Sequence, residues 1–324
     1  MKKYRILVTA VGAIVGYGII ESLRAGKYTP YIVGTDIFPD AVGQYFCDEF
    51  VVAEPAASSE YIPFLIKLIV EKNIDLVLFG IEQEMMVVSD HRDDLAFYLP
   101  KIAIQSKEIM DICNDKWDMA EWMSENNLSD YVIDAVTNGE FDEVLSRFGK
   151  RFLIKPRISR GGKGIAVVER KESYDYYKNI LGRNFMAQRI IGDDEHEYTV
   201  GIFGLGDGAF QNAIYMRRKL SQEGATAKAE VTLNNPYLEE ASARITAALK
   251  PLGPTNYQFR LEGNRVYLLE INPRISSSIS IRTKFGYNEA DMCIDYFLEK
   301  RIPDTADIKR GRAVRYIKDW IVPE

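Results

Sequence analysis

Residues 257–274 read YQFRLEGNRVYLLEINPR, and apolar and polar side chains alternate on both sides of a short turn at 262–264. A period of two is typical of a half-buried strand, so this stretch predicts a β-hairpin. With a three-residue turn, Gln258 lies opposite Leu268, and Glu270 and Asn272 continue along the same face. The opposite face then carries six apolar side chains into a core: Tyr257, Phe259, Leu261, Tyr267, Leu269 and Ile271.

The polar face of this hairpin indicates a metal site. Glu270 and Asn272 are two residues apart, roughly 6.6 Å along a strand, so both side chains could reach a site that holds one or two ions. Their ligand atoms are oxygens, which suit Mg²⁺ better than zinc. An ordinary hairpin with a solvated polar face would give the same pattern.

A second motif is the glycine-rich loop between the predicted strands 152–156 and 165–169. Gly161, Gly162 and Gly164 would let backbone N–H groups approach phosphate oxygens, and Lys155 and Lys163 would supply positive charge. The loop is not a Walker A motif, because it lacks Gly-Lys-Ser/Thr and a strand follows it. A simple turn at the tip of a hairpin remains the alternative.

A third motif consists of an apolar strand at 185–191, an acidic connection at 192–196 and a second strand that begins at Glu197. Backbone groups of 188–191 could bond an adenine edge while Ile190 and Ile191 sandwich the ring, and Glu197 could accept from ribose hydroxyls. A connection between domains with a solvated acidic turn is the alternative for this stretch.

Taken in chain order, the three motifs resemble the ATP-grasp superfamily, and most closely one ATP-binding half of the carbamoyl-phosphate synthase large subunit. The resemblance extends from about residue 4 to 290 and includes the stretches 6–12, 31–36, 74–78 and 113–116. It implies an α/β and α+β architecture with the ATP-grasp fold. An N-terminal Rossmann-like (pre-ATP-grasp) domain would span 1–110, a small lid subdomain 111–188, and a C-terminal subdomain with the adenine pocket and the metal hairpin 189–324.

The resemblance also implies roles for the matching residues. Arg274 would face the transferred phosphoryl group and would form a catalytic pair with Lys155. Mg²⁺, for which Mn²⁺ can substitute, would bind Gln258, Glu270 and Asn272. ATP would contact Lys116, Lys155, Gly161, Gly162, Lys163, Gly164, Gln188, Arg189, Ile190, Ile191 and Glu197. The basic run Arg217, Arg218 and Lys219 matches a further phosphate-binding position loosely, and Lys219 is selected from it.

The expected activity is that of an ATP-dependent carboxylate–amine (or carboxylate–thiol) ligase, which forms an acyl phosphate and releases ADP and phosphate. The synthase has two such halves and a separate glutaminase, whereas this chain resembles one half and lacks a second arginine in 275–278. We therefore expect a different substrate. The alternatives are a non-catalytic ATP-binding or regulatory protein of the same fold, and an ATP-grasp kinase.

The N-terminal residues support a more distant alternative, an NAD-dependent oxidoreductase. Residues 1 to about 110 alternate strands (5–9, 31–34, 74–79) with helices (14–24, 61–72), which predicts a doubly wound parallel sheet. Gly12, Gly16 and Gly18 follow the first strand, and Asp36 ends the second, where a dinucleotide-binding protein would hold its ribose. However, the glycine spacing is not Gly-x-Gly-x-x-Gly.

Composition limits the partners. The chain has 324 residues and a net charge of −6, which argues against nucleic acid and an anionic membrane surface. Three scattered cysteines suit a reducing cytoplasm. The expected partners are small-molecule carboxylates and amines, and the resemblance makes a homodimer plausible. Arg282 and Lys284 are either surface charges or contacts to an anionic acceptor. Farther along the chain we expect helices within 109–126 and at 237–250, and a strand at 313–317.

Overall fold

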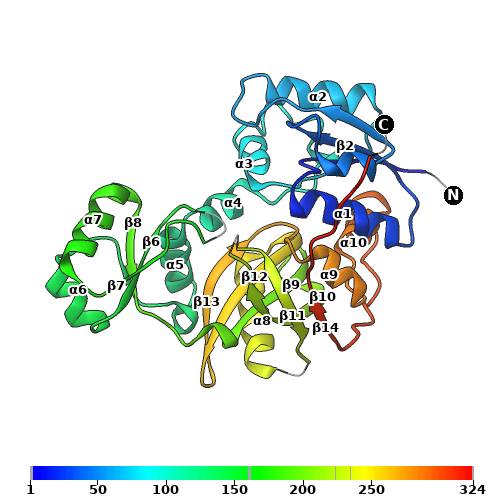
Figure 1. The fold of residues 1–324 in the computed structure, drawn as a ribbon. Helices are drawn as coiled ribbons and strands as arrows, with labels where there is room; N and C mark the ends of the chain where they lie inside the picture. The colour runs from blue at the N-terminus through cyan, green and yellow to red at the C-terminus, as the bar shows by residue number, and fades with distance from the viewer. Residues whose placement is uncertain (1–2, 160–161, 223, 234, 323–324) are drawn as a thin grey trace.

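The computed structural model describes residues 3–159, 162–222, 224–233 and 235–322, which build three β-sheets (Figure 1). The first sheet is parallel with the order β3-β2-β1-β4, as the N-terminal pattern predicts. Alternate residues of β1 face opposite layers: Ile6 and Val8 pack with α1, and Leu7 packs with α2. The elements are β1 (Arg5–Val8), α1 (Ile14–Ala25), β2 (Tyr31–Asp36), β3 (Glu49–Val52), α2 (Tyr61–Glu71), β4 (Leu76–Leu78) and α3 (Glu82–Asp90).

The second sheet is antiparallel and lies to one side of the molecule in Figure 1. Its order is β5-β8-β6-β7, and the helices α6 and α7 enclose an aromatic core in which Phe152 and Tyr174 are completely buried. Two helices, α4 (Lys107–Asn114) and α5 (Lys116–Glu125), lead into it from the first sheet. Its elements are β5 (Ala135–Val136), α6 (Phe141–Phe148), β6 (Phe152–Pro156), β7 (Ala166–Val168), α7 (Lys171–Leu181) and β8 (Phe185–Gln188).

The third sheet has six strands in the order β13-β12-β9-β10-β11-β14. The helix α8 covers one face, while α9, α10 and the π-helix η6 cover the other and pack with α1. Its elements are β9 (Glu197–Leu205), β10 (Phe210–Leu220), β11 (Thr226–Val231), α8 (Pro236–Leu249), β12 (Leu252–Glu262), β13 (Arg265–Asn272), α9 (Ile279–Lys284), α10 (Glu289–Cys293), η6 (Ile294–Leu298) and β14 (Arg312–Val314). The 3₁₀ helices are η1 (Val42–Tyr45), η2 (Leu99–Lys101), η3 (Ser129–Tyr131), η4 (Gly182–Asn184) and η5 (Asp194–His196).

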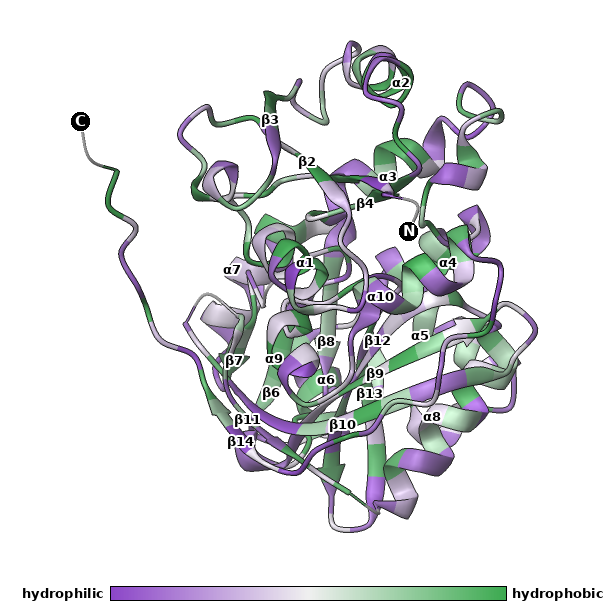
Figure 2. Ribbon diagram, turned by 90° about the vertical axis from the view of Figure 1, so that its right-hand side faces the viewer, coloured by the Kyte–Doolittle hydropathy of each residue, from purple (hydrophilic) through white to green (hydrophobic). Residues whose placement is uncertain are grey.

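The segment after β14 differs from its prediction. The strand ends at Val314 instead of 317, and the chain then leads away from the sheet, as Figure 2 shows. It reaches the N-terminal unit, where Trp320 stacks on Tyr45 with ring centroids 6.0 Å apart and meets Phe46 edge to face at 5.1 Å. The predicted domain boundaries near residues 110 and 188 stay a prediction. No helix of the described residues is long and apolar enough to cross a bilayer.

The hairpin of β12 and β13 has a different register from the predicted one. Glu262 pairs with Arg265, so the turn is Gly263 and Asn264 alone, and a bulge follows the pair of Phe259 with Leu268. As a result Gln258 lies opposite Glu270 instead of Leu268.

The bulge also changes which apolar side chains share a core. Leu268 joins Tyr257, Phe259 and Ile271 in the layer beneath α8. Tyr267 and Leu269 instead pack with Ile133 and Ile191 in a small separate cluster. The prediction that Tyr267 and Leu269 share the core with Phe259 is therefore wrong. The two-residue turn places Tyr267 opposite Arg260, on the other face, and Leu269 is the extra residue of the bulge.

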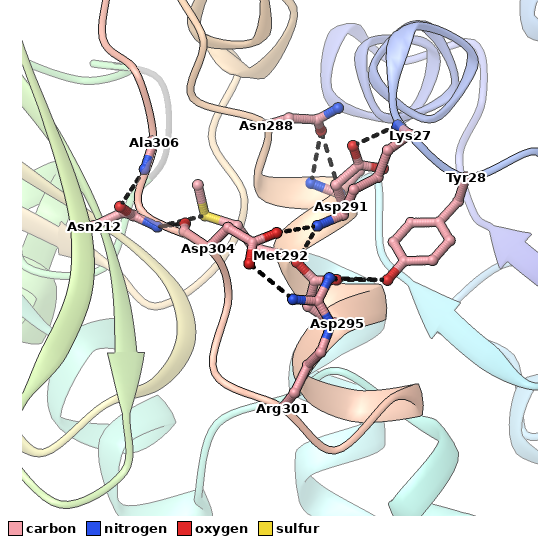
Figure 3. A network of polar contacts seen from close by, with 11 residues as sticks. Lys27, Tyr28, Asn212, Asn288, Asp291, Met292, Asp295, Arg301, Asp304 and Ala306 are labelled. Carbon is pink, nitrogen blue, oxygen red and sulfur yellow. Dashed lines mark hydrogen bonds and ion pairs between the residues drawn. The ribbon is translucent and has the colours of Figure 1, made fainter.

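A buried ionic network joins the N-terminal unit to the third sheet (Figure 3). Asp295 accepts from Lys27 Nζ at 2.8 Å, from the Tyr28 hydroxyl and from Arg301. Asp291 accepts from the backbone N–H of Lys27 at 2.8 Å. These contacts hold the end of α1 against α10 and η6, which fixes the N-terminal sheet beside the site described next.

Candidate active site

Two of the predicted phosphate contacts are lysines, Lys155 on β6 of the second sheet and Lys116 at the start of α5. Lys155 is buried in β6, and Lys116 begins α5 directly after Asp115, whose carboxylate caps that helix. Lys116 Nζ donates to the carbonyl of Ser159 at 3.0 Å and to that of Arg157 at 3.4 Å. These carbonyls belong to the segment that enters the glycine-rich loop, so the helix and the loop are joined through Lys116.

The glycine-rich loop has the backbone that its composition predicts. Gly162 and Gly164 have φ of +70° and +79°, which side chains rarely adopt, and a Cβ on Gly164 would lie 2.8 Å from a ring carbon of Pro156. Lys163, between them, is exposed. The predicted contact Gly161 lies outside the described residues.

The environment of Lys155 is unusually positive. Burial, and after it the charges of Lys116 and Arg260, lower the pKa of its ammonium to about 7, while the charge of Glu270 opposes them. A buried lysine beside two other cations is electrostatically strained until an anion enters. This part of the structure therefore favours a multiply charged anion.

Glu197 is held by two arginines that the sequence reading did not select. Arg218 donates through Nε and Nη2 to Glu197 Oε1 at 3.0 and 2.9 Å, and Arg260 Nη2 donates to Glu197 Oε2 at 2.6 Å. Arg218 Nη2 also donates to Gln258 Oε1 at 2.7 Å. Both carboxylate oxygens of the predicted ribose ligand thus have arginine partners in this structure.

The three predicted metal ligands come together on the hairpin. Gln258 and Glu270 are direct cross-strand neighbours, and Asn272 follows on the same strand. Asn272 is buried; its Oδ1 accepts from Arg274 Nη2 at 2.9 Å, whereas its Nδ2 has no partner among the described residues. A half-buried carboxylate beside two amide groups is the kind of oxygen set that a hard divalent cation takes.

Arg274 connects the hairpin to the N-terminal unit. Its Nε and Nη2 donate to Glu82 Oε2 at 3.2 and 3.0 Å, and Glu82 opens α3 at the carboxyl end of the parallel sheet. The sequence reading missed Glu82, although its position just after the buried strand β4 would place it at the edge of the sheet where open α/β proteins bind ligands.

Only some of the predicted nucleotide contacts on 188–191 and at Lys219 have the burial that a pocket wall requires. Gln188 and Ile191 are buried and Ile190 is half-buried, as a pocket wall requires. Arg189 instead points to the hairpin, where it donates to Tyr267 at 2.8 Å and to Glu262 at 3.0 Å. Lys219 is exposed and pairs with Glu195, whereas its neighbour Arg218 is the basic residue of β10 that faces inward.

Two further charged residues differ from their sequence-based interpretation. Arg282 is completely buried and pairs with Glu289 at 3.1 Å, so it is neither a surface charge nor an available contact for a substrate. The carboxylate of Asp36 accepts from the backbone N–H groups of Gly12 at 2.8 Å and Phe38 at 3.0 Å. These bonds use the acceptor that a dinucleotide ribose would need, which weakens the oxidoreductase alternative.

Comparisons with known proteins show what this chain is similar to. Residues 184–320 match the family model described as ATP-grasp in the biosynthetic pathway with Ter operon. The carbamoyl phosphate synthase large chain of Thermoanaerobacter pseudethanolicus is 26% identical over 221 residues, which are 63% of this chain and 20% of that protein. The chain therefore spans about one fifth of this relative.

Solved structures show the same fold at low sequence identity. The N5-carboxyaminoimidazole synthetase of Staphylococcus aureus, complexed with ADP, superimposes with a TM-score of 0.74 at 16% identity over 95% of this chain and 81% of that one. The L-amino acid ligase of Bacillus licheniformis superimposes with a TM-score of 0.66 at 16% identity over 92% of this chain and 74% of that one. The chain thus has the ATP-grasp fold, matches an ATP-grasp family over 184–320 and resembles an ATP-binding half of the carbamoyl phosphate synthase large chain.

Proposed function

We propose that this protein is an ATP-dependent ligase that joins a carboxylate to an amine or a thiol through an acyl phosphate. The observation that carries the proposal is the group of cations formed by the buried Lys155 with the half-buried Lys116 and Arg260, near Glu270 on the hairpin that also carries Gln258 and Asn272. Such a site suits a magnesium–polyphosphate. The cations of the protein offset the negative charge of the phosphates, and the oxygen ligands bind the magnesium ion. The ADP in the Staphylococcus aureus structure supports a nucleotide as the ligand of this fold.

The metal ligands fit a cation that arrives together with the nucleotide. Glu270 is the only carboxylate of the predicted set, and no group of three His, Cys, Asp or Glu among the described residues could hold a metal. The amide oxygens of Gln258 and Asn272 each accept from an arginine, so these side chains must turn before they can bind a cation. Mg²⁺ in this position supplies charge neutralisation at the phosphates.

The residues of this chain position the reactants and balance their charge. Lys155 and Lys116 hold the phosphate oxygens, and Lys155 gains a proton as the anion approaches. Arg274 stands between the hairpin and Glu82, and it offsets the charge on the phosphoryl group in transfer. The glycine-rich loop keeps water from the acyl phosphate, which would otherwise hydrolyse.

Release of ADP and phosphate from Mg-ATP tests this function. The protein is incubated with pooled carboxylic acids, with and without pooled amines and thiols. We expect ADP release that requires an acid, increases with an acceptor and is lost in Glu270→Ala. Glu239→Ala removes an exposed carboxylate from α8 and should release ADP at the wild-type rate.

Three results would contradict the proposal. ADP release that continues at the wild-type rate in Glu270→Ala would show that the metal ligands of the hairpin take no part in the reaction. Tight binding of ATP without turnover in any pool would indicate a regulatory protein instead. Transfer to a hydroxyl compound without release of phosphate would indicate a kinase.

A further inference from the structure

A cavity separate from the predicted nucleotide site opens where the N-terminal unit meets β12 and the π-helix η6. Its volume is about 460 Å³, and none of the residues predicted to bind nucleotide or metal lines it. Ile102, Leu252 and Phe297 form apolar walls, and Arg92, Lys300 and Arg301 contribute the basic groups. A cavity of this size accommodates a small organic molecule.

The cavity carries positive charge that the protein does not neutralise. Arg301 is already paired with Asp295 and Asp304, as Figure 3 shows. Arg92 and Lys300 form no ion pair with the described residues, and no acidic residue lines the cavity.

Arg92 is incompletely satisfied in this structure. Its Nη2 donates to the carbonyl of Gln105, while its Nε is buried without a partner among the described residues. Burial lowers the pKa of its guanidinium, which means that the charge is poorly solvated. A half-buried arginine whose charge has no acidic partner is well suited to a planar anion such as a carboxylate.

The backbone at the mouth of the cavity is also unusual. The π-helix η6 supplies Phe297, and helices of this type are rare and occur frequently at functional sites. Lys300 follows it with φ of +55°, a conformation that costs energy for a residue with a Cβ.

We propose that this cavity is a second ligand site that binds a small organic anion, a carboxylate on an aromatic or branched apolar body. The carboxylate meets Arg92 and Lys300, and the apolar body fills the space between Ile102, Leu252 and Phe297. The proposal does not depend on ligase activity, because its test measures binding alone.

Calorimetric titration of the full chain with 4-phenylbutyrate tests the proposal. We expect saturable binding of the carboxylate and at least about tenfold weaker binding of the matching amide and amine, because both lack the negative charge. Saturating ADP should leave the affinity unchanged, since the predicted nucleotide contacts do not line this cavity.

Three variants locate the site. Arg92→Gln and Lys300→Asn should each weaken the binding of 4-phenylbutyrate about tenfold. Lys300 is exposed and Asn accepts a positive φ, so this variant should fold even if Arg92→Gln, at a half-buried position, does not. Lys250→Asn is the matched control, because Lys250 is also exposed with φ of +52° but lies after α8, outside the cavity.

The proposal is wrong if the amide binds as tightly as the carboxylate, or if ADP displaces the carboxylate. It is equally wrong if Lys300→Asn binds like the wild-type protein, or if none of the three compounds binds at all.

Discussion

At the residue scale, Lys155 is the side chain whose charge depends most on a ligand. Its pKa is lowered to about 7 by burial and then by the neighbouring charges of Lys116 and Arg260. At pH 8.5 the free protein therefore holds this group mostly uncharged. Bound phosphates favour the charged form, so the complex should contain a proton that the free protein lacks.

Proton uptake on nucleotide binding checks this reasoning. Titration of ADP at pH 8.5 in two buffers of different ionisation enthalpy should show uptake of about one proton, and affinity should fall as the pH rises above about 7. Lys155→Arg keeps a permanent charge and should bind without uptake. Lys163→Arg replaces an exposed lysine of the same loop and should behave as the wild type does. Wild-type binding that takes up no proton would show that Lys155 does not meet the phosphates.

Local pattern predicts individual residues best where a contiguous motif determines their direction. Lys155, the glycine-rich loop and the hairpin ligands come from such motifs, and their roles stay predictions. Arg218 was passed over in favour of Lys219, because adjacent residues of β10 face opposite sides and only the pairing of β10 with β9 and β11 determines which one faces inward. Arg282 was interpreted as a surface charge because its buried partners Glu289 and Thr199 come from other elements.

At the element scale, the hairpin of β12 and β13 determines how the metal ligands meet. The bulge after Phe259 and Leu268 brings Glu270 opposite Gln258. Sequence periodicity predicted both strands but not the register in which they pair. The two-residue turn and the bulge each shift that pairing by one residue, and the alternation of apolar and polar residues reveals neither shift.

The same hairpin predicts that metal binding requires nucleotide. It offers one carboxylate, and the two amide oxygens beside it accept from Arg218 and Arg274. Titration of Mn²⁺ followed by electron paramagnetic resonance should give a dissociation constant weaker than about 1 mM for the protein alone. With ADP present, the protein should bind Mn²⁺ far more tightly, and Glu270→Gln should reduce this gain.

A matched substitution on the far side of the sheet is the control for that experiment. Glu230→Gln removes an exposed carboxylate that pairs with Arg217 on β10, and it should leave binding of Mn²⁺ unchanged. Tight binding of Mn²⁺ to the protein without nucleotide would contradict the account of the hairpin.

At the scale of the whole molecule, the parallel sheet followed from the sequence, whereas the contacts between the sheets did not. The alternation of strand and helix over residues 5–79 predicted that sheet, and the domain ranges that the resemblance implies stay a prediction. The network around Asp295 links Lys27 to residues far along the chain, and no local pattern indicates such a pairing.

Two substitutions in this network should differ in their effect on stability. The side chain of Asp295 is 2% exposed and that of Asp304 is 72% exposed, although both accept from Lys27. Asp295→Ala should lower the free energy of unfolding by about 2 kcal/mol, because it removes several charge-assisted hydrogen bonds of a buried carboxylate. Asp304→Ala should cost less than about 1 kcal/mol, as exposed ion pairs do. Urea unfolding followed by circular dichroism measures both, and equal losses would contradict the proposed role of the network.

Transfer of oxygen from the acid to the released phosphate tests the central claim most directly. The protein is incubated with Mg-ATP, acceptors and carboxylic acids that carry ¹⁸O in the carboxyl group, and the phosphate is examined by ³¹P nuclear magnetic resonance. An acyl phosphate places one carboxyl oxygen in each phosphate that an amine or thiol displaces, so the account predicts phosphate with one ¹⁸O atom. Phosphate without ¹⁸O, which would mean attack by water on ATP, or no release of phosphate at all, would contradict it.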